Sequence, residues 1–393
     1  MKIKNIILAF LFSSFSFCAN YLYAQKRIQI IASHAIKEGH NTVQNYKNIE
    51  EAGFTLAKEG YPSIDEAIEH LKTAEKTKVK LIISCPELFS DMENSVVRLK
   101  VYKSFAGYEI SDEPKASSFY GLGIIVEKLH TLDSSHFAWF NLFPIFTNPK
   151  DLQVDTYEEY VQRFIEEVKP SFISFDCYGI SKTRLHPDYF NNLEIISEKS
   201  KKSGLPFWAY VLTSHFNELI IPTKGTLSFQ AYCNLAYGAQ GLSYFSYRRI
   251  IQPRLNIHIS PVDTNYNKMP IYYDVKELNS EINYYSKFFY GNDVEEVTHL
   301  GAEIPKGCRP TEKLPRGIRV KCFDSNGFVV SHFWNGKKEY LLFVNKNYNE
   351  LQNLQLESEK KIKRISYFRK ERKKGKGVLS YEVQPGSIIL LRI

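Results

Sequence analysis

Two adjacent carboxylates, Asp112 and Glu113, stand at the end of an apolar stretch and directly before Pro114. Proline lacks an N–H and disfavours helical geometry in the residue before it, so the pattern over residues 105–114 predicts a strand that ends and turns here. Helical spacing follows between residues 119 and 129. A pair of carboxyl groups, one protonated and one ionised, is suited to general acid/base chemistry. The sequence therefore predicts an acid-bearing strand end followed by a helix.

A third carboxylate, Asp176, lies within the apolar run 172–178. Burying an ionised carboxylate there is costly unless it has a partner or a chemical role, so we predict Asp176 as the second catalytic carboxylate beside Glu113. Other polar and aromatic groups end predicted strands and, together with Asp112, are predicted to bind substrate: His34, Glu87, Asn141, Tyr178, His215, Tyr244 and Tyr247.

The elements that must position these groups alternate along the chain. Strand patterns and helical patterns follow one another eight times, which predicts a parallel (β/α)8 barrel, an α/β fold, over residues 25–290. The predicted strands span 27–34, 54–57, 79–85, 105–114, 137–143, 172–178, 207–213 and 241–247. Beyond Gly291 short alternating strands are separated by turn residues, which predicts a C-terminal all-β, sandwich-like domain over 291–393.

The N-terminus has the pattern of an export signal. Lys2 and Lys4 precede an apolar run, and small residues lead to Gln25, so residues 1–24 are predicted to be removed and the protein to reach the periplasm or the outside of the cell. Lipid attachment at Cys18 is the alternative for the same segment. No other stretch is long and apolar enough to predict a transmembrane helix.

Cysteine spacing and charge exclude several other classes of protein. Five cysteines remain after the signal, with no Cys-x-x-Cys and no clustered His/Cys spacing, so we predict neither a metal site nor a cofactor. Cys308 and Cys322 are close enough in the sequence to suggest a disulfide across a loop. Ten Lys or Arg stand between residues 360 and 376, which favours a solvated hairpin or contact with anionic glycans. Nucleic acid is not an expected partner of an exported protein.

Four segments of the chain resemble the TIM-barrel glycoside hydrolases, in particular β-galactosidase-like and exported bacterial members. The most specific is Gly-Tyr-Glu-Ile-Ser-Asp-Glu-Pro at residues 107–114, which looks like the acid-bearing fourth strand of that clan. The others are at residues 46–55, 231–245 and 385–391. The resemblance implies an oligosaccharide or polysaccharide substrate and Glu113 as general acid/base, with Asp112 at the position of a sugar-binding Asn.

The sequence departs from this pattern at the seventh strand. Retaining members carry a Glu nucleophile there, whereas this strand runs into Thr213, Ser214 and His215, and Glu218 follows three residues later. Three hypotheses stay open. Asp176 acts with Glu113 as base or nucleophile; or Asp112-Glu113, which resembles the pair of exported β-hexosaminidases, orients a 2-acetamido group that itself attacks; or the barrel binds carbohydrate without cleaving it.

Overall fold

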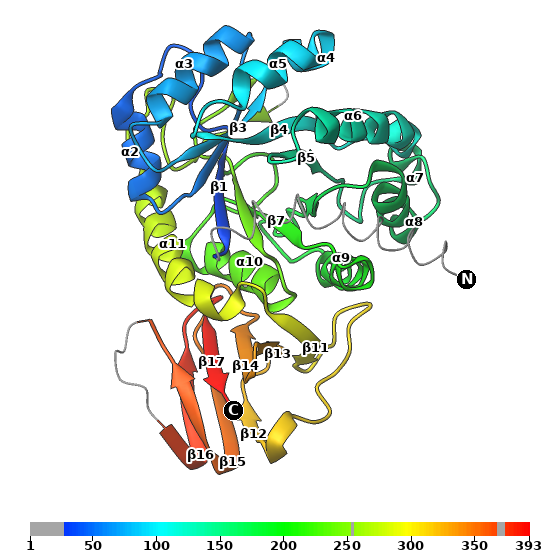
Figure 1. The fold of residues 1–393 in the computed structure, drawn as a ribbon. Coiled ribbons are helices and arrows are strands. Elements are labelled where there is room, and N and C mark those ends of the chain that lie inside the picture. The colour runs from blue at the N-terminus through cyan, green and yellow to red at the C-terminus, as the bar shows by residue number, and fades with distance from the viewer. Residues whose placement is uncertain (1–26, 253–254, 368–373) are drawn as a thin grey trace, which may run out of the picture.

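The computed structural model describes residues 27–252, 255–367 and 374–393, and these form a parallel barrel followed by an antiparallel sheet (Figure 1). The barrel strands pair in the order β5-β4-β3-β2-β1-β8-β7-β6, and a parallel bridge between Leu142 and Phe175 links the two outer strands. The predicted fold class is confirmed. The strands are β1 (Gln29–Ser33), β2 (Leu56–Gly60), β3 (Lys80–Ser84), β4 (Phe105–Asp112), β5 (Phe137–Asn141), β6 (Ile173–Phe175), β7 (Phe207–Leu212) and β8 (Gly241–Phe245).

Helices surround the barrel (Figure 1). Threonine or serine caps begin several of them: the hydroxyl oxygens of Thr42, Ser63, Thr156 and Thr223 each accept a hydrogen bond from a backbone N–H of the first turn. The helices are α2 (Val43–Glu51), α3 (Ile64–Ala74), α4 (Glu87–Ser90), α5 (Met92–Leu99), η1 (Ala116–Ser118), α6 (Phe119–Leu132), α7 (Pro149–Leu152), α8 (Tyr157–Arg163), η2 (Phe164–Val168), α9 (Tyr189–Ser203), α10 (Lys224–Ala236) and α11 (Pro270–Phe289). A short hairpin, β9 (Ile251–Gln252) and β10 (Leu255–Asn256), precedes α11.

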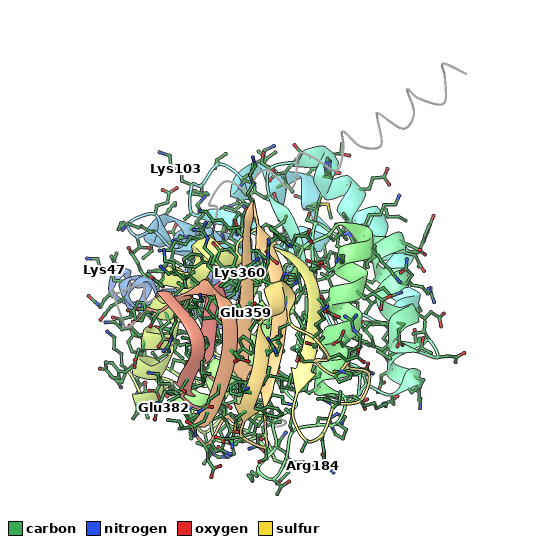
Figure 2. All side chains as sticks on the ribbon, turned by 90° about the horizontal axis from the view of Figure 1, so that it is seen from below. Lys47, Lys103, Arg184, Glu359, Lys360 and Glu382 are labelled. Atoms are coloured by element: carbon green, nitrogen blue, oxygen red, sulfur yellow. The ribbon has the colours of Figure 1, made fainter. Side chains whose placement is uncertain are left out.

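The C-terminal part is one antiparallel seven-stranded sheet. In Figure 2 its strands run side by side across the lower face of the molecule, with Glu359 and Lys360 labelled on the long strand β15. The sequence pattern predicts strands at 328–333, 339–345 and 388–393, where the structure has strands, whereas the strand predicted at 365–368 shares only Ile365 with a strand of the structure. The elements are β11 (Asp293–Leu300), η3 (Pro315–Gly317), β12 (Arg319–Phe323), β13 (Phe328–Asn335), β14 (Lys338–Asn345), β15 (Gln352–Ile365), β16 (Lys374–Val383) and β17 (Ile388–Arg392).

The sheet packs against the barrel through α10 and α11. Its inner face, including Val329, Phe333 and Leu342, belongs to the same apolar core as the barrel helices, whereas the other face forms a separate core. The Ser331 hydroxyl donates to the carbonyl of Ala236 at 2.7 Å, and the Asn335 amide donates to two carbonyls at the end of α11. Apolar packing and buried hydrogen bonds therefore hold the two parts together.

Gly225, in the first turn of α10, allows this close approach. A Cβ at this position would collide with the carbonyl oxygen of Tyr348 and lie 2.9 Å from Cβ of Pro385. We expect Gly225→Ala to destabilise the protein by about 1–3 kcal/mol, because the loops of the sheet must shift away from the helix. Thermal unfolding measures this change. Gly121→Ala is the matched control, since nothing lies within 4 Å of that Cβ on α6, and it should be neutral or stabilising.

Three further predictions concern the signal, the cysteines and membrane-spanning helices. The predicted signal, residues 1–24, and the lipid attachment site considered at Cys18 lie outside the described residues. All five cysteines in the described part of the chain are free thiols, so Cys308 and Cys322 do not form the disulfide that was considered. Within the described ranges, no helix combines the length and apolar character needed to cross a bilayer.

Candidate active site

Alternation along the strands decides which side chains enter the barrel. An aromatic cluster fills its interior: the rings of Phe172 and Trp208 stack at 4.3 Å, and Trp139 lies 5.2 Å from Trp208. Tyr210 belongs to the same interior layer, two residues beyond Trp208 on β7. The barrel centre is thus closed by side chains, and a ligand site must lie at the carboxyl ends of the strands.

Glu113 follows β4 directly and is held by its neighbours on both sides. Its N–H donates to the carbonyl of Asn141 at 2.8 Å, and the carbonyl of Pro114 accepts a 2.6 Å hydrogen bond from the Tyr160 hydroxyl. The backbone of Glu113 has φ 47°, in the left-handed region that a non-glycine residue adopts at a cost of about 1 kcal/mol or more. The turn after β4 therefore fixes the direction in which the Glu113 side chain leaves the strand.

The Glu113 carboxyl group keeps its proton at unusually high pH. Burial is the main cause and the negative charge of Asp112 adds to it; together they raise the pKa of Glu113 to about 7. An ordinary glutamate would be fully ionised at that pH. Glu113 therefore has the property that a general acid needs at neutral pH.

Asp176 follows β6 and faces the same site. The Asn141 amide donates to its Oδ1 at 2.7 Å, and the Ser174 hydroxyl donates to the amide oxygen of Asn141 at 3.2 Å, which sets the orientation of that amide. Burial first, then the charges of Glu113 and Asp112, raise the pKa of Asp176 to about 8, although the bond from Asn141 opposes this.

The two raised pKa values share causes, because burial and the charge of Asp112 act on both groups, and the charge of Glu113 also acts on Asp176. Such groups lose their protons as a coupled set rather than independently. Between about pH 7 and pH 8 the pair therefore holds roughly one proton. Acid-assisted cleavage uses the form in which that proton is on Glu113 and Asp176 is ionised.

A buried ion pair lies beside these acids, and the sequence analysis missed it. Lys58 on β2 forms a close ion pair with Glu109 on β4, and the charge of Lys58 also acts on Tyr210. The predicted second strand, 54–57, stopped one residue before Lys58, whereas β2 runs from Leu56 to Gly60. A lysine two residues after an interior leucine was the available signal, since residues i and i+2 share a face.

We expect Lys58→Met to destabilise the protein by about 3–5 kcal/mol, because it leaves Glu109 buried without its partner. Chemical denaturation measures the loss, and Lys58→Met combined with Glu109→Leu should recover most of it. Lys72→Met removes an exposed ion pair with Glu69 on α3 and should change stability little. Equal effects of the two single variants would contradict the internal role of Lys58.

Aromatic rings and His34 form the wall opposite the acids. Tyr178 lies 5.7 Å from Phe245 and 6.5 Å from Tyr210, and Phe245 meets His34 edge-on at 5.3 Å. Burial lowers the pKa of His34 to about 3, helped by the charges of Lys58 and Arg248, so its imidazole is neutral. Neutral imidazole and aromatic faces suit the hydroxyl groups and apolar face of a sugar ring.

The structure brings together Asp112, Glu113, Asn141, Asp176 and Tyr178 of the predicted site residues, and places His34 at the edge. The predicted substrate contacts of Tyr244 and Tyr247 are wrong. Their side chains are 0% and 1% exposed and pack edge-on against Phe54 in the layer between barrel and helices. Because side chains alternate, Phe245 rather than Tyr244 faces the interior.

Glu87 and His215 have local partners that explain them without a ligand. The Glu87 carboxylate accepts a 3.1 Å hydrogen bond from the N–H of Ile64, the first residue of α3, and its predicted contact with substrate stays a prediction. His215 lies in the loop after β7, where Nδ1 is 3.0 Å from the carbonyl oxygen of Leu219. Glu218 is largely exposed and pairs with Lys182 at 3.4 Å.

The end of β7 carries hydroxyl groups where a nucleophile would be expected. The Thr213 hydroxyl donates to the carbonyl of Ser246 at 3.1 Å, and the hydroxyls of Ser214 and Ser246 are 3.0 Å apart. These bonds tie the ends of β7 and β8 together. The carboxylates of this site therefore come from β4 and β6.

A barrel with acids at the carboxyl end of β4 and an all-β domain behind it has the fold of the TIM-barrel glycoside hydrolases, as the sequence resemblance implied. Two solved structures show this likeness over nearly the whole chain. A GH42 β-galactosidase from G. stearothermophilus, solved as a catalytic mutant, covers 95% of this chain and 99% of its own, with a TM-score of 0.64 and 7% identity. The β-galactosidase from Bacillus circulans sp. alkalophilus covers 93% and 99%, with a TM-score of 0.63 and 9% identity.

These identities are low, so the likeness concerns the fold. No protein-family model matches the sequence, and no curated protein matches it.

Proposed function

We propose that this protein is a glycosidase, with Glu113 as the general acid and Asp176 as the second carboxylate. The observation that carries the proposal is the pair of carboxyls with raised pKa values, about 7 and about 8, at the carboxyl ends of β4 and β6. In this scheme Glu113 protonates the leaving oxygen as the glycosidic bond breaks. Asp176, oriented by Asn141, attacks the anomeric carbon or activates a water molecule once it has lost its proton, so the reaction uses the state of the coupled pair in which Glu113 holds the proton and Asp176 does not.

The substrate we propose is a glycan or oligosaccharide outside the cytoplasm. Two features support it: the export signal expected over residues 1–24, and the wall formed by Tyr178, Phe245 and His34. Periplasmic and extracellular sites are both compatible with such a signal. No metal or organic cofactor enters the proposed reaction.

A substrate-assisted reaction is the second candidate, and the end of β7 favours it. Thr213 and Ser214 there offer no carboxylate, so a 2-acetamido group on the sugar would supply the attacking oxygen, with Asp112 and Asp176 as the acids available to orient it. The same feature supports the alternative of a carbohydrate-binding barrel without catalysis.

A panel of aryl glycosides, with and without 2-acetamido groups, tests these proposals on the mature protein. Hydrolysis of neutral glycosides supports Asp176 as nucleophile or base, and the anomer released, followed by proton NMR, separates retention from inversion. Hydrolysis limited to 2-acetamido sugars supports the assisted reaction. Binding of oligosaccharides without hydrolysis of any member of the panel would overturn the enzyme and leave the binding protein.

A further inference from the structure

Four polar side chains from separate segments meet where the sheet packs on the barrel. Glu194 comes from α9, Tyr237 follows α10, His299 lies on β11, and Cys308 belongs to the loop after β11. The Tyr237 oxygen is 2.9 Å from Oε1 of Glu194, 2.9 Å from Nε2 of His299 and 3.9 Å from Sγ of Cys308. One potential ligand atom each from Glu194, His299 and Cys308 lies within 4.8 Å of the others.

Thiolate, imidazole and carboxylate are the ligand types that zinc prefers in proteins. In a tetrahedral site, ligand atoms about 2.0–2.3 Å from the metal are roughly 3.3–3.8 Å from one another. The potential ligand atoms of Glu194, His299 and Cys308 lie within 4.8 Å of one another, a limit about 1 Å wider than this range. Small side-chain adjustments would therefore surround an ion, with the Tyr237 oxygen or a water molecule as the fourth ligand.

The state of His299 points to a ligand independently of these distances. His299 is 1% exposed, and its Nδ1 is a buried polar atom without a hydrogen-bond partner among the described residues. An unsatisfied nitrogen of this kind is costly to bury, and a metal bound at Nδ1, with Nε2 left to its contact with the Tyr237 oxygen, would remove that cost.

We propose that Glu194, His299 and Cys308 form a zinc site, with Tyr237 beside them, that ties the C-terminal sheet to the barrel. The three ligands come from the barrel helix α9, from strand β11 and from the loop between β11 and β12. Because these ligands come from both domains and lie where the domains pack together, we assign the metal a structural role. The metal therefore stabilises the docking of the two domains and takes no part in the chemistry at Glu113.

Metal content and spectroscopy of the tag-free mature protein test the proposal. We expect about one zinc per chain after dialysis against metal-free buffer, and a thiolate-to-metal absorption band in the near ultraviolet when cobalt replaces zinc. Removing the metal with EDTA should lower the melting temperature by several degrees, because a ligand bound to the folded state alone stabilises that state.

Two cysteine variants make the test specific. Cys308→Ser should lose the zinc and the cobalt band, whereas Cys322→Ser, which changes an exposed free thiol on β12, should keep both. His299→Gln should also lose the zinc, and its circular dichroism should match that of the wild type. Wild-type protein that binds no zinc tightly, or Cys308→Ser that binds it as the wild type does, would overturn the site and show a hydrogen-bonded cluster instead.

Discussion

Glu113→Gln lowers kcat/KM for the best aryl glycoside by about 10²–10⁴, the range that positioned proton transfer contributes. The glutamine amide has the shape of the carboxyl group but no proton to give to the leaving oxygen. Initial rates measure the loss. The melting temperature should not fall, because the wild-type group is itself held close to its neutral form by burial.

The size of the loss should depend on the leaving group. A substrate whose phenol is a strong acid needs little protonation, so Glu113→Gln should affect a dinitrophenyl glycoside much less than an unactivated disaccharide. Asp112→Asn is the neighbouring comparison: it keeps the Glu113 carboxyl group, so whatever loss it causes should not depend on the leaving group. An equal loss for all leaving groups would contradict general acid catalysis by Glu113.

Asp176→Asn should abolish most activity and yet make the protein more stable in alkaline solution. The folded protein holds a proton on Asp176 up to about pH 8, whereas the unfolded chain releases it near pH 4. The folded state therefore binds more protons in this window, and stability falls as pH rises through it. Asparagine carries no charge to bury, so the melting temperature of the variant should exceed that of the wild type by a few degrees at pH 9.

A second buried aspartate provides a control of opposite sign. Burial opposes ionisation of Asp133, but the 2.7 Å hydrogen bonds that its carboxylate accepts from Nδ1 of His136 and from the Tyr108 hydroxyl outweigh burial and lower its pKa. That group stabilises the folded state above its ordinary pKa, so Asp133→Asn should lower the melting temperature at pH 7 and at pH 9. Destabilisation by Asp176→Asn at pH 9 would show that its carboxylate has a partner stronger than Asn141.

The barrel and the acid-bearing strand end could be predicted from sequence because local rules determine them. Pro114 stops β4, and the apolar periods repeat with the strand and helix lengths of a (β/α)8 fold. Asp176 was predictable for a related reason, since a carboxylate within an apolar run needs an explanation. These signals depend on residues close together in the chain.

The rest depended on information that a single sequence does not contain. Barrel strands are buried on both faces, so an apolar run does not reveal whether Tyr244 or Phe245 faces the interior. Glu194 lies far from His299 and Cys308 in the sequence, and the three meet only because the two domains pack together. Their spacing along the chain matches no local motif. Strand β16 begins with alternating lysine and glycine at residues 374–377, which carry little β propensity, before its apolar part at 378–383.

The three tryptophans of this chain are divided between its two parts in a useful way. Trp139 and Trp208 are buried together in the barrel, whereas Trp334 is partly exposed on β13 and donates a 2.9 Å hydrogen bond to Glu295. The fluorescence of Trp139 and Trp208 therefore reports a buried environment, and that of Trp334 a partly solvent-exposed one. Each domain has its own intrinsic fluorescent probe, and in Trp334→Phe the tryptophan emission would report unfolding of the barrel alone.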